Sequence, residues 1–293
     1  MRALPLHDRS QFNYRLALVL GSGGVRSIAA VGIVEILARA GIRPDLLVGC
    51  SSGALFAATI ALRMPPPDAL HLATSLWSPE LTRRRRLWSY VQLVAPRLAG
   101  FDADFGLRDS RLIAERIAHA FGPVWIEELP TTLRVAATDA MRGTPVVLRS
   151  GRLVDALRAS VAVPFIFPSV LVDGRRLVDG VISDPLPIAA AADAHAVLTL
   201  GFEGAMPRKV DRPARLVAQV STALINNLQR ARIAAAQAGG QRVLALELAL
   251  ERRVGLWETA ALRSVYEAGK RAAEQQLPAI RALLEGSAAA RAA

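Results

Sequence analysis

Short, continuous apolar runs recur along the chain and are separated by turns rich in glycine and proline. The runs at 16–20 and 46–48 contain no polar residue, which is typical of central strands in a parallel sheet, because both faces of such strands are buried. Each run is followed by a mostly apolar segment of helical length, at 28–40 and 54–62. This alternation predicts an α/β fold of three layers (α/β/α), with a central, mostly parallel sheet between helices.

The alternation continues to the end of the chain. The expected elements are a helix from about Ser110 to Gly122, strands at 132–138 and 144–148, a strand at 197–202, a helix at 213–237, a strand at 242–248 and a final helix at 258–284. No linker-like break or internal repeat interrupts the pattern. We therefore interpret residues 1–293 as one domain with a core over about 14–275, and the alanine-rich tail at 287–293 as frayed.

Composition narrows the class of protein. The chain has 293 residues, of which 52% are hydrophobic, so it can bury a large core. Its longest stretch without charged residues, 46–62, includes glycine, cysteine and serine, and it fits a strand, turn and helix better than a membrane span. The first fifteen residues lack the apolar core of a signal peptide. We therefore expect a soluble, cytoplasmic protein without a transmembrane helix.

The net charge of +11 favours anionic surfaces, either lipid or nucleic acid, although a general preference for arginine accounts for much of it. Basic residues next to Trp88 and Tyr90 suit peripheral contact with an anionic membrane, and they suit a solvated helix edge equally well. We expect no nucleic-acid binding. The basic run consists of Arg83, Arg84, Arg85 and Arg86.

The segment GCSSG at 49–53 places Ser51 between Gly49 and Gly53, in the spacing GxSxG. It lies between an expected strand and an expected helix, which is the context of a nucleophile elbow. The glycines permit a sharp turn against neighbouring backbone, and the helix N-terminus beneath the serine favours negative charge. Ser51 is therefore the candidate nucleophile. We interpret Cys50, the only cysteine, as a small buried residue.

A glycine-rich turn at 21–27 joins the first expected strand to its helix. Such a turn can cradle a dinucleotide pyrophosphate, or its N–H groups can form an oxyanion hole. The dinucleotide pattern requires a small residue where this chain has Arg26, and the serine motif follows about one strand–helix unit later. The oxyanion interpretation is therefore the more economical. Its candidate residues are Gly21, Ser22, Gly23, Gly24, Val25 and Arg26.

These segments, LVLGSGGVRS, GIVEIL and GCSSGAL, resemble the N-terminal half of the patatin-like phospholipase family. The family's oxyanion loop reads roughly GGGxRG, whereas this chain has Ser27 where glycine is usual. The run at 137–170, with its loop of alternating proline and phenylalanine, and the YEAG stretch at 266–269 are also similar to the family. The resemblance covers about residues 14–275 and is weakest between 63 and 105.

Two identical LVDG tetrads contain the candidate acid. The first contains Asp173 and Gly174 and is followed by two arginines and another apolar run, which favours a hairpin turn and a structural role. The second, at Asp179 and Gly180, resembles the family's Asp-Gly-Gly/Ala motif, whose aspartate pairs with the serine. The resemblance therefore implies a catalytic dyad of Ser51 and Asp179. Val181 replaces a usually small residue, and its β-branched side chain would narrow the site or shift the loop.

By resemblance, the expected activity is a serine-dependent lipid acyl hydrolase of the phospholipase A or lysophospholipase type, acting on lipid esters. A Ser-Asp dyad is chemically sufficient when the carboxylate reaches the hydroxyl. One cysteine and four scattered histidines provide no metal-ligand spacing, so we expect neither a metal nor another cofactor.

Two alternatives stay open at this point. The departures at Ser27 and Val181 also fit a catalytically silent lipid-binding or scaffold protein with the same fold. A soluble carboxylesterase or thioesterase with a Ser-Asp-His triad would need a histidine after the acid, and only His195 follows it. That histidine lies just before an apolar run, where an ordinary loop or helix-end residue is the common case.

Overall fold

A computed structural model of the chain describes residues 12–77, 87–102, 105–207 and 209–285. Their strands form one sheet in the order β5-β6-β3-β2-β1-β7-β8, with β4 also paired to β3. Five strands pair in parallel: β1 (Tyr14–Leu20), β2 (Leu46–Cys50), β3 (Thr132–Asp139), β7 (Ala194–Leu200) and β8 (Arg242–Ala245). The antiparallel strands are β4 (Pro145–Leu148), β5 (Val170–Val172) and β6 (Arg175–Asp179).

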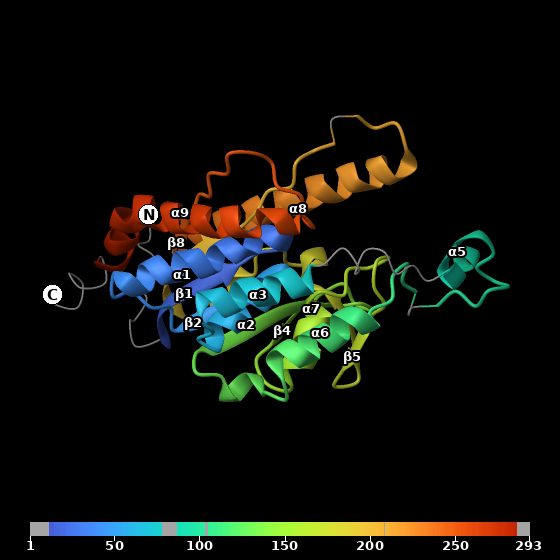
Figure 1. Cartoon of the computed structure of the whole chain (residues 1–293), viewed down its shortest axis with the longest axis horizontal. Coiled ribbons are helices and arrows are strands. Elements are labelled where there is room, and N and C mark those ends of the chain that lie inside the picture. Colours follow the sequence, from blue (N-terminus) through green and yellow to red (C-terminus); the bar gives the residue numbers. More distant parts are fainter. Residues whose placement is uncertain (1–11, 78–86, 103–104, 208, 286–293) are drawn as a thin grey trace, which may run out of the picture.

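Helices cover both faces of this sheet (Figure 1). On β1, Leu16, Leu18 and Leu20 pack with one layer of helices, and the alternate residues Ala17 and Val19 pack toward α8 on the other face. The predicted three-layer fold class is therefore confirmed. The helices are α1 (Ala29–Arg39), α2 (Ser52–Ala61), α3 (Pro66–Leu76), α5 (Leu87–Val94), α6 (Arg111–Phe121), α7 (Leu153–Ser160), α8 (Pro213–Ala238) and α9 (Leu262–Glu285).

The helices α1 and α9 cross at very short distance because glycines face each other's backbone. A Cβ atom on Gly269 would lie 2.2 Å from the carbonyl oxygen of Ala29, and one on Gly32 would lie 2.3 Å from that of Tyr266. Only glycine allows this approach. The YEAG stretch noted in the sequence is thus a packing motif, which holds the last helix of the described chain against the helix that follows the glycine-rich turn.

The expected β-hairpin is confirmed at Asp173, where β5 and β6 are joined by two residues. Asp173 and Gly174 have φ values of 48° and 75°, as a tight hairpin turn requires at both central positions. Two other expectations, the basic run at 83–86 and the frayed tail from 287, lie outside the described residues.

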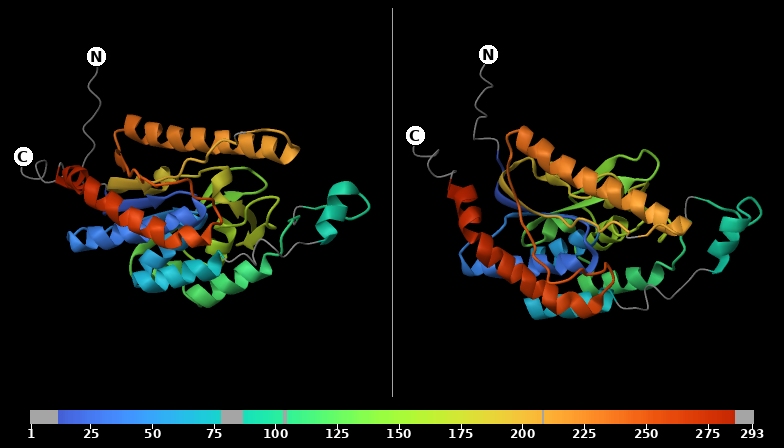
Figure 2. Two further views of the ribbon diagram at one scale, coloured as in Figure 1. Left: turned by 45° about the horizontal axis from the view of Figure 1, so that its top comes forward. Right: turned by 90° about the horizontal axis from the view of Figure 1, so that it is seen from above.

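The carboxyl ends of β1 and β2 lie at the same end of the sheet, and the loops that follow them meet there. The helix α5 and the N-terminal half of α8 extend beyond this end of the molecule, as the views in Figure 1 and Figure 2 agree. The C-terminal part of α9 lies at the opposite end. The loops of the candidate site, α5 and the N-terminal half of α8 therefore lie toward the same end of the molecule.

Candidate active site

Ser51 occupies the sharp turn between β2 and α2 predicted from GxSxG. Its φ of 57° and ψ of −127° are unusual for a residue with a Cβ atom, and such a conformation costs of order 1–3 kcal/mol. Neighbouring backbone leaves no room for larger residues on either side: a Cβ on Gly53 would lie 2.4 Å from the Leu20 carbonyl oxygen, and one on Gly49 would lie 2.4 Å from Ala54 Cα. The elbow therefore holds the serine in a strained position at the end of the strand.

The Ser51 hydroxyl donates a hydrogen bond to Asp179 Oδ2 at 2.7 Å, although the two residues are 128 positions apart. The sheet register explains this meeting. Ala136, on β3, lies opposite Cys50, and the next residue of β3 lies opposite Asp179, at the end of β6. Asp179 Oδ1 accepts a second hydrogen bond, from the Val181 N–H, at 2.9 Å. Both carboxylate oxygens are thus held in place by donors.

The Asp179 carboxyl is fully buried. Burial raises its pKa to about 7, while the hydrogen bonds from the Val181 N–H and the Ser51 hydroxyl act in the opposite direction. A carboxylate that titrates near neutral pH is a far better proton acceptor than one with an ordinary pKa near 4. Asp179 therefore has the environment of a general base, placed next to a hydroxyl that could lose its proton.

Ser160, the last residue of α7, holds the elbow in place through two hydrogen bonds. Its hydroxyl accepts a hydrogen bond from the Ser51 N–H at 2.8 Å and donates one to the Ala136 carbonyl oxygen at 2.6 Å. The side chain is fully buried. Sequence reasoning missed this residue, because a serine at a helix end carries no motif. Ser160 connects the strained serine to the strand that aligns Asp179.

The N–H groups of the glycine-rich loop all have partners inside the protein. Those of Gly21 and Ser22 donate to the carbonyl oxygens of Leu200 and Pro185, at 2.9 and 3.2 Å. Farther along, the N–H groups of Val25 and Arg26 donate to the carbonyl oxygens of Leu256 and Gly23, at 3.0 and 3.3 Å. Of these six N–H groups, only those of Gly23 and Gly24 donate to a side chain.

Those two N–H groups converge on one oxygen atom. Gly23 and Gly24 donate to the Ser52 hydroxyl oxygen at 3.0 and 2.7 Å. The same hydroxyl lies 2.9 Å from the hydroxyl of Ser27, the residue that departs from the family's usual glycine. Two donors directed at a single oxygen is the geometry of an oxyanion hole, but in this structure the oxygen belongs to the protein. Sequence reasoning did not anticipate this role of Ser52.

Arg26 supports the loop with its side chain. Its Nε donates to the Gly23 carbonyl oxygen at 3.2 Å, its Nη1 donates to the Glu203 carbonyl oxygen at 3.1 Å, and the guanidinium lies over the Phe202 ring at 5.1 Å. None of these three contacts is directed at Ser51. The structure therefore places Arg26 as a brace between the glycine-rich loop and the segment after β7, within the predicted loop but away from the dyad.

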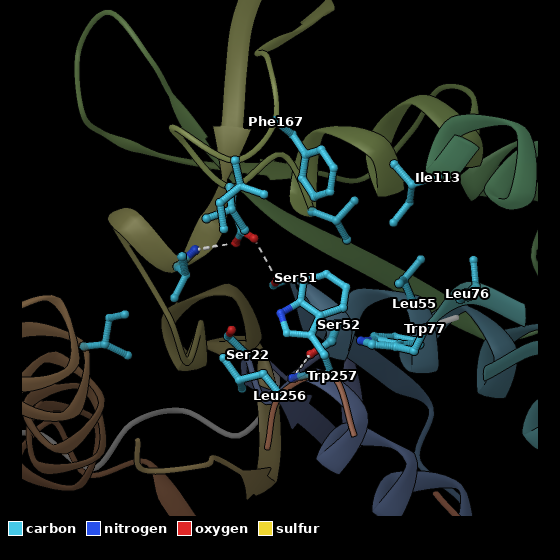
Figure 3. Close-up of a pocket in the computed structure, with 17 residues that line it drawn as sticks. Ser22, Ser51, Ser52, Leu55, Leu76, Trp77, Ile113, Phe167, Leu256 and Trp257 are labelled. Carbon is cyan, nitrogen blue, oxygen red and sulfur yellow. Dashed lines mark hydrogen bonds between the residues drawn. The ribbon is translucent and has the colours of Figure 1, made fainter. Parts of the chain in front are cut away.

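An apolar cavity of about 210 Å³ opens beside the dyad (Figure 3). It exceeds the roughly 150 Å³ that is enough for a benzene ring, so it can accept a short acyl segment. Its polar lining comes from Ser22, Ser51, Ser52 and Asp179. The rest of the lining is almost entirely apolar: Gly24, Leu55, Leu76, Trp77, Ile113, Val161, Val163, Ile166, Phe167, Val181, Ile225, Leu256 and Trp257.

Val181 belongs to the wall of this cavity. Its side chain is buried and packs with Cys50, Ala136 and Ile225, while its backbone N–H holds Asp179. The β-branched side chain therefore takes up space beside the dyad without disturbing the acid loop. The neighbouring Cys50 is fully buried as well, and burial together with the Asp179 charge raises the pKa of its thiol, so it has the environment of an inert core residue.

The structure separates His195 from the site. It is the second residue of β7, at the amino end of that strand, whereas Ser51 follows the carboxyl end of β2. At about 3.3 Å per residue, the length of the strand keeps the imidazole well beyond hydrogen-bonding distance of the serine. Its Nε2 instead lies 3.3 Å from Arg242 Nη1, and its ring contacts Phe12 edge-on. The Ser-Asp-His alternative is therefore not supported by the geometry.

Within the described residues, no three His, Cys, Asp or Glu side chains come together as metal ligands would. The same part of the chain also contains no helix with the length and apolar character needed to cross a membrane.

The patatin-like phospholipase family model matches residues 18–192, which is more than half of the chain. The chain therefore belongs to the patatin-like phospholipase family. This membership supports lipid acyl hydrolase activity in general.

The individual relatives and solved structures that are similar to this chain share only a minority of its residues. An uncharacterised NTE family protein of Mycobacterium tuberculosis is 34% identical over 200 residues, or 67% of this chain and 50% of the relative. Lysophospholipase NTE1 of Scheffersomyces stipitis is 28% identical over 177 residues, or 60% of this chain and 11% of the relative. Among solved structures, VipD from Legionella pneumophila aligns with a TM-score of 0.45 and 12% identity, over 89% of this chain and 67% of that one. The chain thus spans about half the length of the mycobacterial relative.

Proposed function

We propose that this protein is a serine-dependent lipid acyl hydrolase of the phospholipase A or lysophospholipase type, with Ser51 as nucleophile and Asp179 as general base. One observation carries the proposal. The hydroxyl of Ser51, a residue with a strained backbone, donates a 2.7 Å hydrogen bond to a buried carboxylate at the edge of an apolar cavity. Membership of the patatin-like phospholipase family supports it independently.

The reaction would proceed in two steps. Asp179 Oδ2 accepts the Ser51 proton while Ser51 Oγ attacks the carbonyl carbon of the ester, forming a tetrahedral intermediate. Asp179 then returns the proton to the departing alcohol, which leaves Ser51 acylated. In the second step Asp179 takes a proton from water, the resulting hydroxide attacks the acyl group, and the proton passes back to the Ser51 oxygen. The free acid leaves and the dyad is restored.

The negative charge on the carbonyl oxygen needs donors, and the N–H groups of Gly23 and Gly24 are the candidates, because both are directed at one oxygen atom of the residue next to Ser51. They would become free when the Ser52 hydroxyl turns from them toward Ser27, its third neighbour in the structure. The acyl oxygen would then replace the serine oxygen between the same two donors. The N-terminus of α2, directly after Ser51, adds a favourable dipole.

The cavity supports an acyl chain as the group that is bound. Its lining is apolar except beside the dyad, so a hydrocarbon tail gains by leaving water there while the ester lies at the serine. The same dyad geometry argues against a catalytically silent scaffold, because neither Ser27 nor Val181 displaces Ser51 or Asp179 from hydrogen-bonding distance.

A fluorophosphonate probe tests the proposal directly. We expect covalent labelling of the folded wild-type protein, with peptide mapping to Ser51 rather than the neighbouring Ser52, and no labelling of Ser51→Ala. A panel of phosphatidylcholine, lysophosphatidylcholine and p-nitrophenyl butyrate then identifies the ester that is hydrolysed. A folded protein that is not labelled and hydrolyses none of them would support the scaffold alternative and sink the enzyme proposal.

Shortening Val181 should change which acyl groups are accepted. In Val181→Ala the backbone N–H that holds Asp179 remains, but the cavity gains the space of two methyl groups beside the dyad. We expect kcat/KM for a longer or branched acyl ester, relative to butyrate, to rise roughly tenfold. Ile182→Ala is the matched control, since Ile182 is the next residue and is 52% exposed. An unchanged ratio would show that Val181 does not limit the acyl site.

A further inference from the structure

Exposed apolar side chains gather at the end of the molecule where the cavity opens. Most of the large hydrophobic residues that are exposed in the described chain lie in three segments, 88–101, 206–224 and 256–257. Single exposed apolar residues are normal on protein surfaces, but a concentration of this kind indicates a surface that is covered in use.

The first segment is a braced hairpin rather than a loose loop. The Ser89 hydroxyl donates to the Gly106 carbonyl oxygen at 2.7 Å, and Gln92 Nε2 donates to the Gly100 carbonyl oxygen at 3.0 Å. These bonds close α5 and the turn after it into a unit that presents Trp88 and Leu98 to solvent, with exposures of 60% and 92%. The hairpin thus holds large apolar side chains away from the core.

The second segment is the N-terminal half of α8. Val217, Val220 and Leu224 are spaced at i, i+3 and i+7, so they share one face of the helix, and each is at least half exposed. Beyond them α8 is anchored to the core: Asn226 pairs with the backbone of Gly204, and Arg232 Nε binds Asp184 Oδ1 at 3.1 Å. The apolar face therefore extends from a firmly fixed helix.

Both segments are linked to residues that line the cavity. At the end of the hairpin, the Phe101 ring packs against Phe105, whose ring in turn lies edge-on to Phe165, the neighbour of the lining residue Ile166. The α8 face ends directly before Ile225, which lines the cavity. The third segment, Leu256 and Trp257, is part of the lining and is 51% and 41% exposed. Figure 1 and Figure 2 show α5 and the N-terminal half of α8 projecting beyond the same end of the sheet.

We propose that the hairpin 88–101 and the α8 face 217–224 form a docking surface for an anionic lipid bilayer, here called the apolar rim, which brings the cavity entrance against the membrane. The proposal rests on the proposed function, because a lipid acyl hydrolase must take its substrate from such a surface. It adds the turn after α5 and the α8 face to the basic run, Trp88 and Tyr90, for which the sequence already indicated membrane contact.

Charge and position select a bilayer over a protein partner. Lys209 and Arg212 lie just before α8, and Arg215, which pairs with Asp211, lies in its first turn. Arg97 lies in the hairpin, and the four arginines at 83–86 directly precede α5 in the sequence. Basic side chains beside apolar and aromatic ones suit an interface of anionic headgroups and acyl chains. A protein seated on both projections, including a second copy of this chain, would cover the entrance that the substrate must use.

Vesicle binding by the Ser51→Ala protein tests the docking surface without hydrolysis. Two double variants remove apolar contacts, Trp88→Glu with Leu98→Glu and Val217→Glu with Leu224→Glu. The control pair, Trp125→Glu with Ala235→Glu, adds the same charge at exposed positions outside the rim. On vesicles of phosphatidylcholine and phosphatidylglycerol, we expect each rim variant to bind at least about tenfold more weakly than the control. Phosphatidylcholine alone should bind the unmodified rim more weakly.

The outcomes separate docking from catalysis. When the same rim substitutions are made in a protein that retains Ser51, the variants should lose hydrolysis of vesicle lipid but retain hydrolysis of p-nitrophenyl butyrate. Equal vesicle binding by the rim variants and the control would overturn the docking proposal, even if fluorophosphonate labels Ser51. Rim variants that only convert a dimer to a monomer, with vesicle binding unchanged, would overturn it in favour of a contact between copies. Loss of fluorophosphonate labelling with rim-dependent binding intact would instead refute only the enzymatic function.

Discussion

Asp179→Asn is expected to abolish ester hydrolysis while making the protein more stable above pH 7. Asparagine can keep both hydrogen bonds, with its oxygen accepting from the Val181 N–H and its amide donating to the Ser51 oxygen. It cannot take a proton from the serine. Loss of a general base of this kind costs about 10²- to 10⁴-fold in rate, and we expect kcat to fall by about 10³-fold or more.

The gain in stability follows from the sign of the pKa change. Burial raises the pKa of Asp179 from 3.8 to about 7, so between these values the folded protein binds a proton that the unfolded chain releases. Stability from this group is therefore present at low pH and is lost as the pH rises toward 7. The cost of the buried charge reaches on the order of 4 kcal/mol at pH 8, and the neutral amide does not incur it.

Urea unfolding at pH 4 and pH 8 measures this effect, and a pH–rate profile measures its functional counterpart. The stability difference between Asp179→Asn and wild type should be largest at pH 8 and small at pH 4. Wild-type kcat/KM should rise with pH through about 7, as the carboxyl ionises. Asp173→Asn, in the other LVDG tetrad, is the matched control and should change neither. A less stable Asp179→Asn at pH 8 would contradict the account of the buried charge.

Ser160→Ala is expected to reduce both stability and turnover. The substitution removes a fully buried hydroxyl and leaves the Ser51 N–H and the Ala136 carbonyl oxygen without that partner. Each unsatisfied buried group costs about 1–3 kcal/mol, so we expect a loss on the order of 3 kcal/mol. The strained elbow would also relax, and a displacement of the nucleophile by about 1 Å can lower the rate about 10²-fold.

A role of Ser160 in positioning the nucleophile is distinguished from a loss of folding by the kinetic constant that changes. Assays well below the melting temperature of the variant should show a lower kcat with KM nearly unchanged. Ser183→Ala is the control: its hydroxyl contacts Thr138 Oγ1 at 2.8 Å, and that threonine keeps its bond to the Asp179 carbonyl oxygen. If Ser160→Ala lost stability but kept full kcat, Ser160 would be structural only.

Local patterns in the sequence were enough to predict the frame of the site. The apolar runs at 16–20 and 46–48 are buried strands, and GxSxG forms the strained turn because glycine is needed on both sides. The hairpin at Asp173 is also a local feature. Assigning the first LVDG tetrad to that turn left Asp179, in the second tetrad, as the candidate acid. The close approach of Asp179 to Ser51 agrees with the resemblance, but the register of β3 that produces it is a tertiary property.

The contacts that complete the site depend on tertiary packing and have no local signal. Ser160 and Ser52 are ordinary small polar residues until the fold brings backbone donors to their hydroxyl groups. The glycine-rich loop was expected to offer free N–H groups, whereas in the structure each one from Gly21 to Arg26 has a partner. Likewise, the sequence predicts a helix at 213–237, and only the fold shows that Val217, Val220 and Leu224 on it are exposed.

The position of β1 in the sheet has a consequence for how far the chain can be shortened. β1 pairs with β2 on one side and with β7 on the other, and β7 begins at Ala194, after the family match ends at residue 192. The Val25 N–H is bound by the Leu256 carbonyl oxygen, later still. A fragment cut at residue 192 would lack β7 and β8 and turn β1, an interior strand, into an open edge of unpaired N–H and C=O groups, which invites aggregation. The minimal folding unit is therefore longer than the segment by which the family is recognised.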